Sequence, residues 1–167
     1  TKSPTDPLSV AVSQLTLSQF RNYESLRLNL DPSNIVLTGP NGAGKTNLLE
    51  AISLLAPGRG FRGTRLADFA HKKRNNTDLA ASGWGIATKL ISPHGQIEIG
   101  TGLEDQGTEG DLPSSDRRVV RINGNYVRGP AVLTEVVAVR WLTPAMDRMF
   151  TESASRRRKF LDHLTAG

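Results

Sequence analysis

The sequence predicts an α/β domain with an adjoining antiparallel β meander. Three observations lead to this expectation. A short apolar run at 33–39 leads into a glycine-rich loop, apolar residues then recur at helical spacing, and three segments between 79 and 129 alternate as β-strands do. The chain has 167 residues, which is enough for one domain with a buried core.

Two strands are expected before the glycine-rich loop. The segment 8–20 alternates between apolar and polar residues, with a change of parity between Val12 and Leu15 that predicts a bulge. The segment 24–30 alternates strictly and places its three leucines on one face. The run 33–39, SNIVLTG, is continuously apolar at its centre, which is typical of a strand buried on both faces.

A helix is expected after the loop. Its apolar residues fall at helical spacing: Leu48, Leu49, Ile52 and Leu55. The Pro-Gly pair at 57–58 is expected to end it. Glu50 lies one turn after Thr46 and is expected on the surface or in a helix pairing. The Gly- and Arg-rich stretch 58–69 predicts a loop that runs into a short helix.

The middle of the sequence predicts the meander. Its strands are expected at 79–91, 96–104 and 117–129, with turn residues in SPHGQ and NGN. The stretch 104–116 is polar and Gly-rich. A second buried strand is expected at 135–142, EVVAVRWL.

The domain organisation follows from these elements. Residues 1–7 hold two prolines and no apolar anchor, so we expect a leader there. Residues 8–142 form one lobe, with the meander at about 79–129. Residues 143–167 are expected to begin a helical second lobe, with Thr143 as N-cap, Pro at the first helical position, and a helix at 152–164.

Composition narrows the possible partners and locations. Lys and Arg number 21 against 16 Asp and Glu, and a net charge of +5 favours polyanions such as DNA, RNA or nucleotides. No apolar run approaches the roughly 20 residues that span a bilayer. The chain has no Cys, which removes disulfides and Cys-based zinc sites. We therefore expect a cytoplasmic protein with no membrane partner.

The glycine-rich loop carries the strongest functional signal. Gly39, Gly44, Lys45 and Thr46 complete the pattern G-x-x-x-x-G-K-[ST] between a predicted strand and a predicted helix. The glycines let successive N–H groups point at phosphate oxygens, and the helix adds its positive end. Lys45 supplies a charge for the β- and γ-phosphates and Thr46 a hydroxyl for Mg²⁺. The pattern alone leaves GTPases, small-molecule kinases, helicases and transport ATPases open.

The surrounding residues narrow these classes. The predicted hairpin LTLSQFRNYESLRLNL, followed by GPNGAGKTNLLEAI, resembles ATPase heads of the ABC and structural-maintenance-of-chromosomes (SMC) or Rad-fifty type. With INGNYVRG, VVAVRWLTPAMDRMF and SASRRRKFLDHL, the chain is similar to the RecF family of bacterial recombination mediators. The resemblance covers residues 15–164.

This resemblance implies the N-terminal part of a P-loop NTPase head that binds ATP with Mg²⁺ and dimerises head to head when ATP is bound. It also implies action on DNA at junctions of single and double strands. There, with other recombination mediators, the family supports recombinase loading at gaps and stalled forks. The implied nucleotide contacts are Gly39, Pro40, Asn41, Gly42, Ala43, Gly44, Lys45, Thr46 and Asn47, with Arg21 and Asn22 near the nucleotide and Thr46 at the metal. Arg21 is equally compatible with a solvated turn.

Two groups of basic residues are candidates for DNA contact. They are Arg59, Arg62 and Arg65 after the first helix, and Arg156, Arg157, Arg158 and Lys159 in the predicted C-terminal helix. A solvated loop and a solvated helix face are the ordinary interpretations of such groups.

The sequence lacks the carboxylate pair that completes ATP hydrolysis in this class. No run of four apolar residues ends in Asp-Glu or Asp-Asp. The family's signature segment, which contacts the γ-phosphate across the dimer, lies beyond residue 167. We therefore expect a fragment that binds ATP with little or no hydrolysis, and a central sheet with an unprotected edge.

Three alternatives stay open. The first is another SMC-like head, including heads associated with a nuclease domain. The second is a transport ATPase subunit, although RWLTPAMD lacks the usual Gln of that class. The third is a small-molecule kinase, for whose lid the meander is unsuited.

Overall fold

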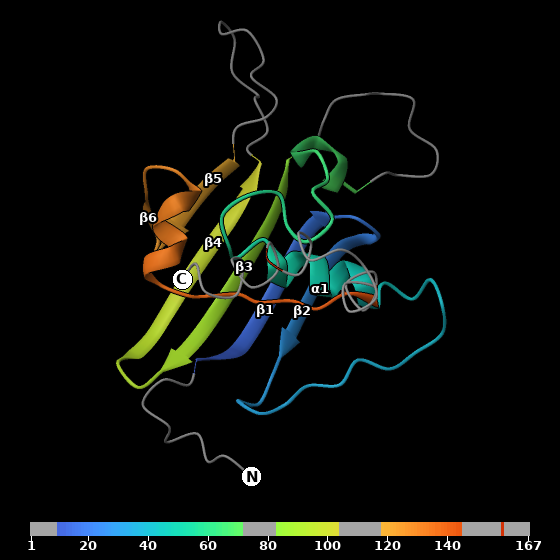
Figure 1. The fold of residues 1–167 in the computed structure, drawn as a ribbon, viewed down its shortest axis with the longest axis horizontal. Coiled ribbons are helices and arrows are strands. Elements are labelled where there is room, and N and C mark those ends of the chain that lie inside the picture. Colours follow the sequence, from blue (N-terminus) through green and yellow to red (C-terminus); the bar gives the residue numbers. More distant parts are fainter. Residues whose placement is uncertain (1–9, 72–82, 104–117, 145–157, 159–167) are drawn as a thin grey trace, which may run out of the picture.

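The computed structural model describes residues 10–71, 83–103, 118–144 and 158. Its main element is one six-stranded antiparallel sheet with the order β2-β1-β3-β4-β5-β6 (Figure 1). The strands are β1 (Ala11–Phe20), β2 (Tyr23–Asn29), β3 (Trp84–Ser92), β4 (Gly95–Leu103), β5 (Arg118–Ile122) and β6 (Asn125–Tyr126). The helix α1 (Lys45–Ser53) and the 3-10 helices η1 (Leu66–Phe69) and η2 (Pro130–Glu135) complete the described elements.

The predicted hairpin and meander are both confirmed, but they form a single sheet. β1 pairs with β2 on one side and with β3 on the other, so the hairpin continues into the meander. The register of β1 against β3 shifts between Val12 and Gln14, where the change of parity predicted a bulge. The α/β expectation is met only in part, since every strand pairing in the described ranges is antiparallel.

The two predicted buried strands at 33–39 and 135–142 are wrong. Ile35 is 48% exposed, Val36 is 82% exposed and Leu142 is 77% exposed. Residues 130–135 form η2, and the stretch that follows has no strand assignment. A strand needs a neighbour that accepts and donates its ladder hydrogen bonds. Within the described ranges neither segment has such a neighbour. Val136, Val137 and Val139 nevertheless pack against the core without joining a ladder.

The predicted helix is confirmed at its start, and Leu48, Ile52 and Leu55 of its predicted apolar face pack in or against the core. Its end and two positions on its surface differ from the prediction. It ends at Ser53, and the next residues form tighter turns, with Leu55 N donating to Ile52 O at 3.0 Å. Leu49, expected on the apolar face, is 55% exposed, whereas Glu50, expected on the surface or in a helix pairing, is 0% exposed. The buried side of this segment therefore also includes Glu50, Ala51 and Leu54.

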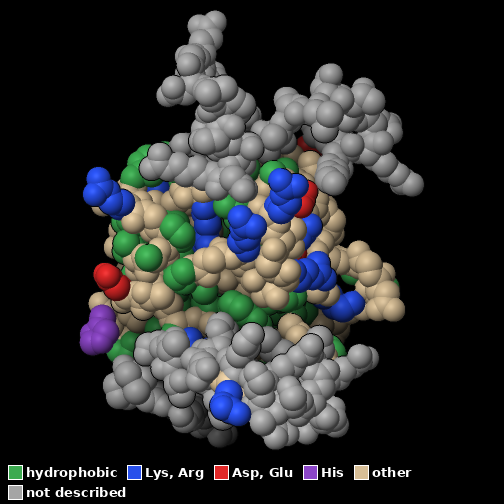
Figure 2. Space-filling view, turned by 45° about the horizontal axis from the view of Figure 1, so that its top comes forward, with side chains coloured by type: hydrophobic (Ala, Val, Ile, Leu, Met, Phe, Trp, Pro, Cys, Tyr) green, Lys and Arg blue, Asp and Glu red, His purple; other side chains and the backbone are tan. Residues whose placement is uncertain are grey.

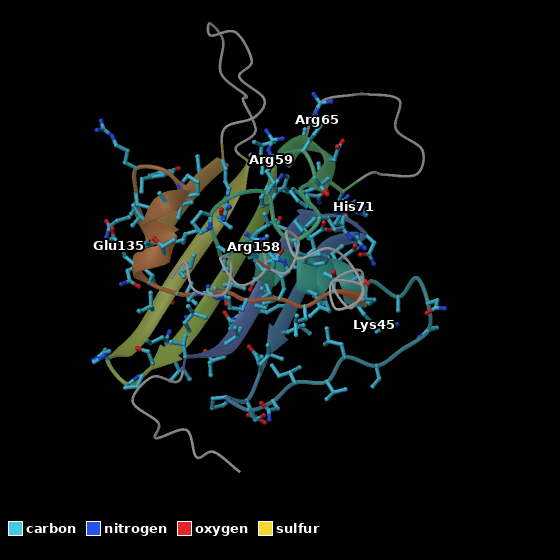
Figure 3. The ribbon with its side chains drawn as sticks, in the orientation of Figure 1. Lys45, Arg59, Arg65, His71, Glu135 and Arg158 are labelled. Carbon is cyan, nitrogen blue, oxygen red and sulfur yellow. The ribbon has the colours of Figure 1, made fainter. Side chains whose placement is uncertain are left out.

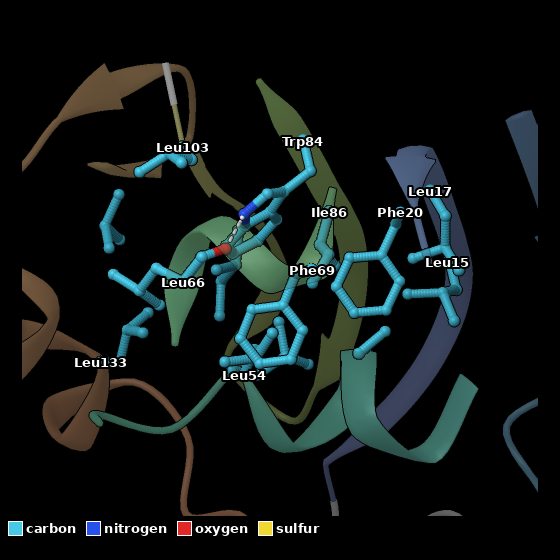
Figure 4. Packing of buried hydrophobic residues seen from close by; sticks show 14 of the residues in the cluster. Leu15, Leu17, Phe20, Leu54, Leu66, Phe69, Trp84, Ile86, Leu103 and Leu133 are labelled. Carbon is cyan, nitrogen blue, oxygen red and sulfur yellow. Dashed lines mark hydrogen bonds between the residues drawn. The ribbon is translucent and has the colours of Figure 1, made fainter. Parts of the chain in front are cut away.

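The core lies between the sheet and the layer formed by α1 and η1. Phe20, Phe69 and Trp84 stand at its centre, with ring centroids 5.4 to 5.6 Å apart (Figure 4). The indole Nε1–H of Trp84 donates to the carbonyl oxygen of Leu66 at 2.7 Å, which fixes η1 over the sheet. The other face of the sheet is polar and carries the ion pair between Lys89 and Glu98 at 2.7 Å. None of the helices in the described ranges is long and apolar enough to cross a membrane.

Candidate functional site

The glycine-rich loop has the backbone that a phosphate-binding loop requires. Gly39, Gly42 and Gly44 have φ angles of 144°, 84° and 100°, a region that side-chain-bearing residues rarely adopt. Gly44 is the N-cap of α1, so the loop runs directly into the helix. Residues 40–43 are exposed, which leaves the loop open to a ligand.

The start of α1 offers donors for an anion. Among the backbone hydrogen bonds of the described residues, those of Asn47 and Leu48 to Gly44 O, at 2.8 and 3.1 Å, are the first of this helix. The amides of Lys45 and Thr46 therefore remain available at the positive end of the helix dipole. The Lys45 ammonium donates to Gly39 O at 2.6 Å and to Pro40 O at 2.8 Å, so it already lies over the loop. These donors fit the phosphates of a nucleotide.

The turn between β1 and β2 packs against this loop. Asn47 Nδ2 donates to Asn22 Oδ1 at 2.7 Å, and the Tyr23 hydroxyl donates to Ala43 O at 3.5 Å. Gly44 has a φ of 100°, which disfavours any other residue, and a Cβ atom there would also displace the side chains of Asn22 and Tyr23. The structure thus brings Asn22 next to Asn47 at the end of the loop. Contact of these two residues with nucleotide stays a prediction.

Arg21 binds a buried carboxylate beside the loop. Its Nε donates to Glu50 Oε2 at 2.9 Å and its Nη2 donates to Glu50 Oε1 at 3.0 Å, a bidentate arrangement. The same guanidinium donates to Thr64 Oγ1 at 3.2 Å and lies 4.7 Å from the Phe69 ring centroid. Its side chain is 20% exposed, so Arg21 is not a solvated turn residue. A role near nucleotide stays a prediction.

The segment 57–65 carries three of the predicted DNA-contact arginines, and we call it the arginine loop. Arg59, Arg62 and Arg65 are all exposed. Figure 3 shows Arg59 and Arg65 toward the top of the view near η1, whereas Lys45 lies at the start of α1. Figure 2 shows several Lys and Arg side chains and fewer Asp and Glu side chains on the face that it presents.

Two buried groups hold the arginine loop in place. Ser53 Oγ accepts from the Phe61 amide at 3.1 Å and donates to Glu50 O at 2.7 Å. Arg118, on β5, donates from Nη1 to Ala56 O at 3.0 Å and to Gly58 O at 2.9 Å. The loop therefore presents its arginines from a fixed backbone.

Arg118 also completes the carboxyl end of α1. Its Nη2 donates to Leu54 O and its Nε donates to Thr101 Oγ1 at 2.7 Å. Desolvation by burial lowers the pKa of Arg118 to about 10, so the side chain stays charged at neutral pH. A cation near the last carbonyls of a helix is favourable because of the helix dipole.

We expect Arg118→Met to destabilise the fold by about 2 kcal/mol, because it leaves several carbonyls without a donor. Thermal unfolding followed by circular dichroism measures the effect. Arg128→Met is the matched control, since Arg128 is exposed, and it is expected to change stability by less than about 0.5 kcal/mol. Equal stabilities of the two variants would contradict the capping role.

Glu50 and Arg118 are buried charges that the sequence pattern did not predict. Arg118 and Val120 lie two residues apart on one strand, so their side chains face the same side of the sheet, and Val120 is in the core. This alternation is the feature of the sequence that could have predicted the burial of Arg118. The second group of predicted DNA-contact residues is Arg156, Arg157, Arg158 and Lys159. Arg158 is helical and exposed, and the other three lie outside the described residues. The predicted helix at 152–164 lies outside them as well, apart from Arg158. No group of three or more His, Asp or Glu in the described ranges is arranged to hold a metal.

Comparisons with known proteins identify relatives of this chain. The family model described as the RecF/RecN/SMC N terminal domain matches residues 11–91. The DNA replication and repair protein RecF of Mesorhizobium japonicum is 47% identical over 158 residues, which are 95% of this chain and 38% of that protein. RecF of Allorhizobium ampelinum is 48% identical over 153 residues, covering 92% of this chain and 38% of that protein.

Solved structures show the same fold. A structure of the recombination mediator RecF with ATP matches 97% of this chain and 39% of its own, with a TM-score of 0.73 and 23% identity. A structure from work on ATP-driven dimerisation of SMC ATPases matches 93% of this chain and 99% of its own, with a TM-score of 0.69 and 15% identity. The chain therefore has the fold of the SMC and RecF ATPase head region, and it spans less than two fifths of the RecF proteins it matches. The chain is a RecF homologue that corresponds to the amino-terminal part of those proteins.

Proposed function

We propose that this chain is the ATP-binding N-terminal part of a RecF-like DNA replication and repair protein. The observation that carries the proposal is the loop of positive-φ glycines that runs into α1, with Lys45 folded over it. In this proposal, residues 39–47 hold the phosphates, and Asn22 supports the loop through Asn47. The solved RecF relative bound to ATP supports the choice of nucleotide.

Mg²⁺ is the metal that fits this proposal. Thr46 is exposed at the first turn of α1, where its hydroxyl would be a hard oxygen ligand. The ion would neutralise charge on the phosphate oxygens when it is bound with ATP. The chain's own residues contribute the backbone amides, the Lys45 ammonium and the Thr46 hydroxyl.

DNA is the proposed second ligand, and the arginine loop is its proposed contact. Three exposed arginines on a loop held by Ser53 and Arg118 suit the phosphate backbone of a nucleic acid. The proposal for the whole protein includes recombinase loading at gaps and stalled forks, action together with other recombination mediators, and an ATP-dependent homodimer. Within the proposal, residues 8–142 form the N-terminal lobe of the head and residues 143–167 begin a second lobe.

Calorimetric titration of ATP with Mg²⁺ into the chain, beside a phosphate-release assay, tests the nucleotide part. We expect binding with little or no phosphate release, because the sequence has no suitable carboxylate pair. AMP is the control ligand, and we expect it to bind at least about tenfold more weakly because it lacks the β- and γ-phosphates.

Each alternative result has a definite meaning. Absence of ATP binding would overturn the proposal for this chain. Turnover that Lys45→Ala abolishes would show that a catalytic carboxylate lies within these 167 residues.

A further inference from the structure

The turn between β1 and β2, which packs against the glycine-rich loop, has a strained backbone. Gln19 and Arg21 have φ angles of 48° and 54°, values that residues with a side chain rarely adopt. Such conformations cost free energy and persist only where the surrounding structure holds them in place. The turn includes Asn22, which binds Asn47 next to the proposed metal ligand Thr46. The groups that hold this turn therefore bear on the geometry of the proposed nucleotide site.

The end of η1 and the residues that follow it hold the strained turn through their backbone. The amide of Arg21 donates to the carbonyl oxygen of Phe69 at 2.7 Å, and the amide of His71 donates to the carbonyl oxygen of Gln19 at 2.7 Å. An isolated antiparallel bridge lies between these two hydrogen bonds. The turn and residues 69–71 therefore pair as two short antiparallel segments.

His71 also holds the turn with its side chain. Its Nδ1 donates to the carbonyl oxygen of Arg21 at 2.7 Å, and Nδ1 carries the proton because a carbonyl oxygen can only accept. His71 is half-buried, and Figure 3 shows it beside the turn. The bonded carbonyl belongs to the peptide group that joins Arg21 to Asn22. The imidazole therefore fixes the orientation of that peptide group.

This orientation decides where the Asn22 side chain points. Asn22 is exposed, so packing does not restrict its side chain, and its Oδ1 accepts from Asn47 Nδ2 at 2.7 Å. Such a contact is favoured when the backbone already directs the amide toward its partner. Asn47 follows Thr46, and its own amide donates to Gly44 O at 2.8 Å in the first turn of α1. The contacts thus run from His71 to the residues proposed to hold the phosphates and Mg²⁺.

We propose that His71 is a positioning residue for nucleotide binding: its imidazole fixes the peptide group between Arg21 and Asn22 and, through Asn22, supports the start of α1 that receives the phosphates. This inference rests on the proposed function. His71 acts through Asn22 and Asn47 rather than by touching the nucleotide. Removal of its Nδ1–H donor therefore weakens ATP binding only while the Asn22 amide is present.

Calorimetric titration of ATP with Mg²⁺ into variants of the chain measures this role. His71→Leu removes the donor, and we expect it to weaken ATP binding at least about fivefold. His71→Asn has nearly the shape of the leucine variant but offers an N–H donor in place of Nδ1–H, so we expect its affinity to stay within about twofold of the unmodified chain. Asn22→Ala removes the contact with Asn47, and we expect it to weaken ATP binding at least about fivefold.

A double variant distinguishes positioning from a general loss of structure. Once Asn22→Ala has removed the amide, His71→Leu has little left to disturb, so we expect the double variant to bind ATP within about twofold of Asn22→Ala alone. Thermal unfolding followed by circular dichroism checks the fold of every variant. His71→Ala replaces His71→Leu if the leucine variant does not give the cooperative transition of a folded protein.

His94→Leu is the matched control. His94 is exposed in the turn between β3 and β4, and we expect its substitution to leave ATP affinity unchanged.

The outcomes separate this inference from the proposed function. An unmodified chain that does not bind ATP would overturn the proposed function. If the unmodified chain binds ATP, full affinity in His71→Leu would overturn the role of His71 and leave the proposed function standing. Equal weakening in His71→Leu and His71→Asn would show that the donor is not the cause, and additive losses in the double variant would show that Asn22 is not the route. Either result would overturn the inference.

Discussion

Arg21→Met is expected to destabilise the fold by about 3 kcal/mol, because it leaves a fully buried carboxylate without its main partner. Glu50 is 0% exposed, and Arg21 provides both of its short charge-assisted hydrogen bonds. Arg62 remains near the carboxylate, but its 3.6 Å contact is longer and half exposed. Methionine retains much of the length of the arginine side chain, so it leaves only a small cavity. The loss of stability therefore reports mainly the broken ion pair.

Urea or thermal unfolding followed by circular dichroism measures this loss. Arg27→Met is the matched control, since Arg27 lies exposed on β2, and we expect it to change stability by less than about 0.5 kcal/mol. The double variant Arg21→Met/Glu50→Leu removes both charges and is expected to recover most of the lost stability. A double variant as unstable as the single one would show that the unpaired carboxylate is not the cause.

Lys45→Ala is expected to lower ATP affinity by at least about 100-fold, because it removes the ammonium that is proposed to bind the β- and γ-phosphates. The fold should persist, since the hydrogen bonds of the Lys45 ammonium go to the exposed loop carbonyls of Gly39 and Pro40. Calorimetric titration of ATP with Mg²⁺ gives the affinity, and circular dichroism gives the fold.

Lys89→Ala is the matched control for this experiment. Lys89 pairs with Glu98 on the polar face of the sheet, and we expect its loss to leave ATP affinity unchanged. Unchanged ATP affinity in Lys45→Ala itself would contradict the assignment of residues 39–47 as the phosphate-binding loop.

The features that the sequence predicts well are those set by local patterns. Alternation gave the hairpin, the meander and the bulge after Val12, because side-chain period and turn residues act over a few positions. The glycine motif gave the start of α1 for the same reason. The family resemblance, which rested on quoted motifs, is confirmed by the RecF relatives.

The features that it predicts poorly depend on distant neighbours. The apolar runs around Ile35 and Trp141 were expected to be strands. A strand must pair with a second strand, and its own residues do not show whether such a partner is present. Glu50 is buried because Arg21, 29 residues away, reaches it. Arg118 is buried because it contacts carbonyl groups of the segment that follows α1, up to 64 residues away. Charged residues are expected at the surface unless such partners are known.

The contact of Arg118 with the end of α1 has a consequence for the order of folding. A helix of nine residues is too short to persist alone in water. The carbonyls of Leu54, the C-cap of α1, and of Ala56 beyond it gain the Arg118 donor only when β5 has joined the sheet, since Arg118 lies far along the chain. The end of α1 is therefore completed late, in the same cooperative unit as the fifth strand.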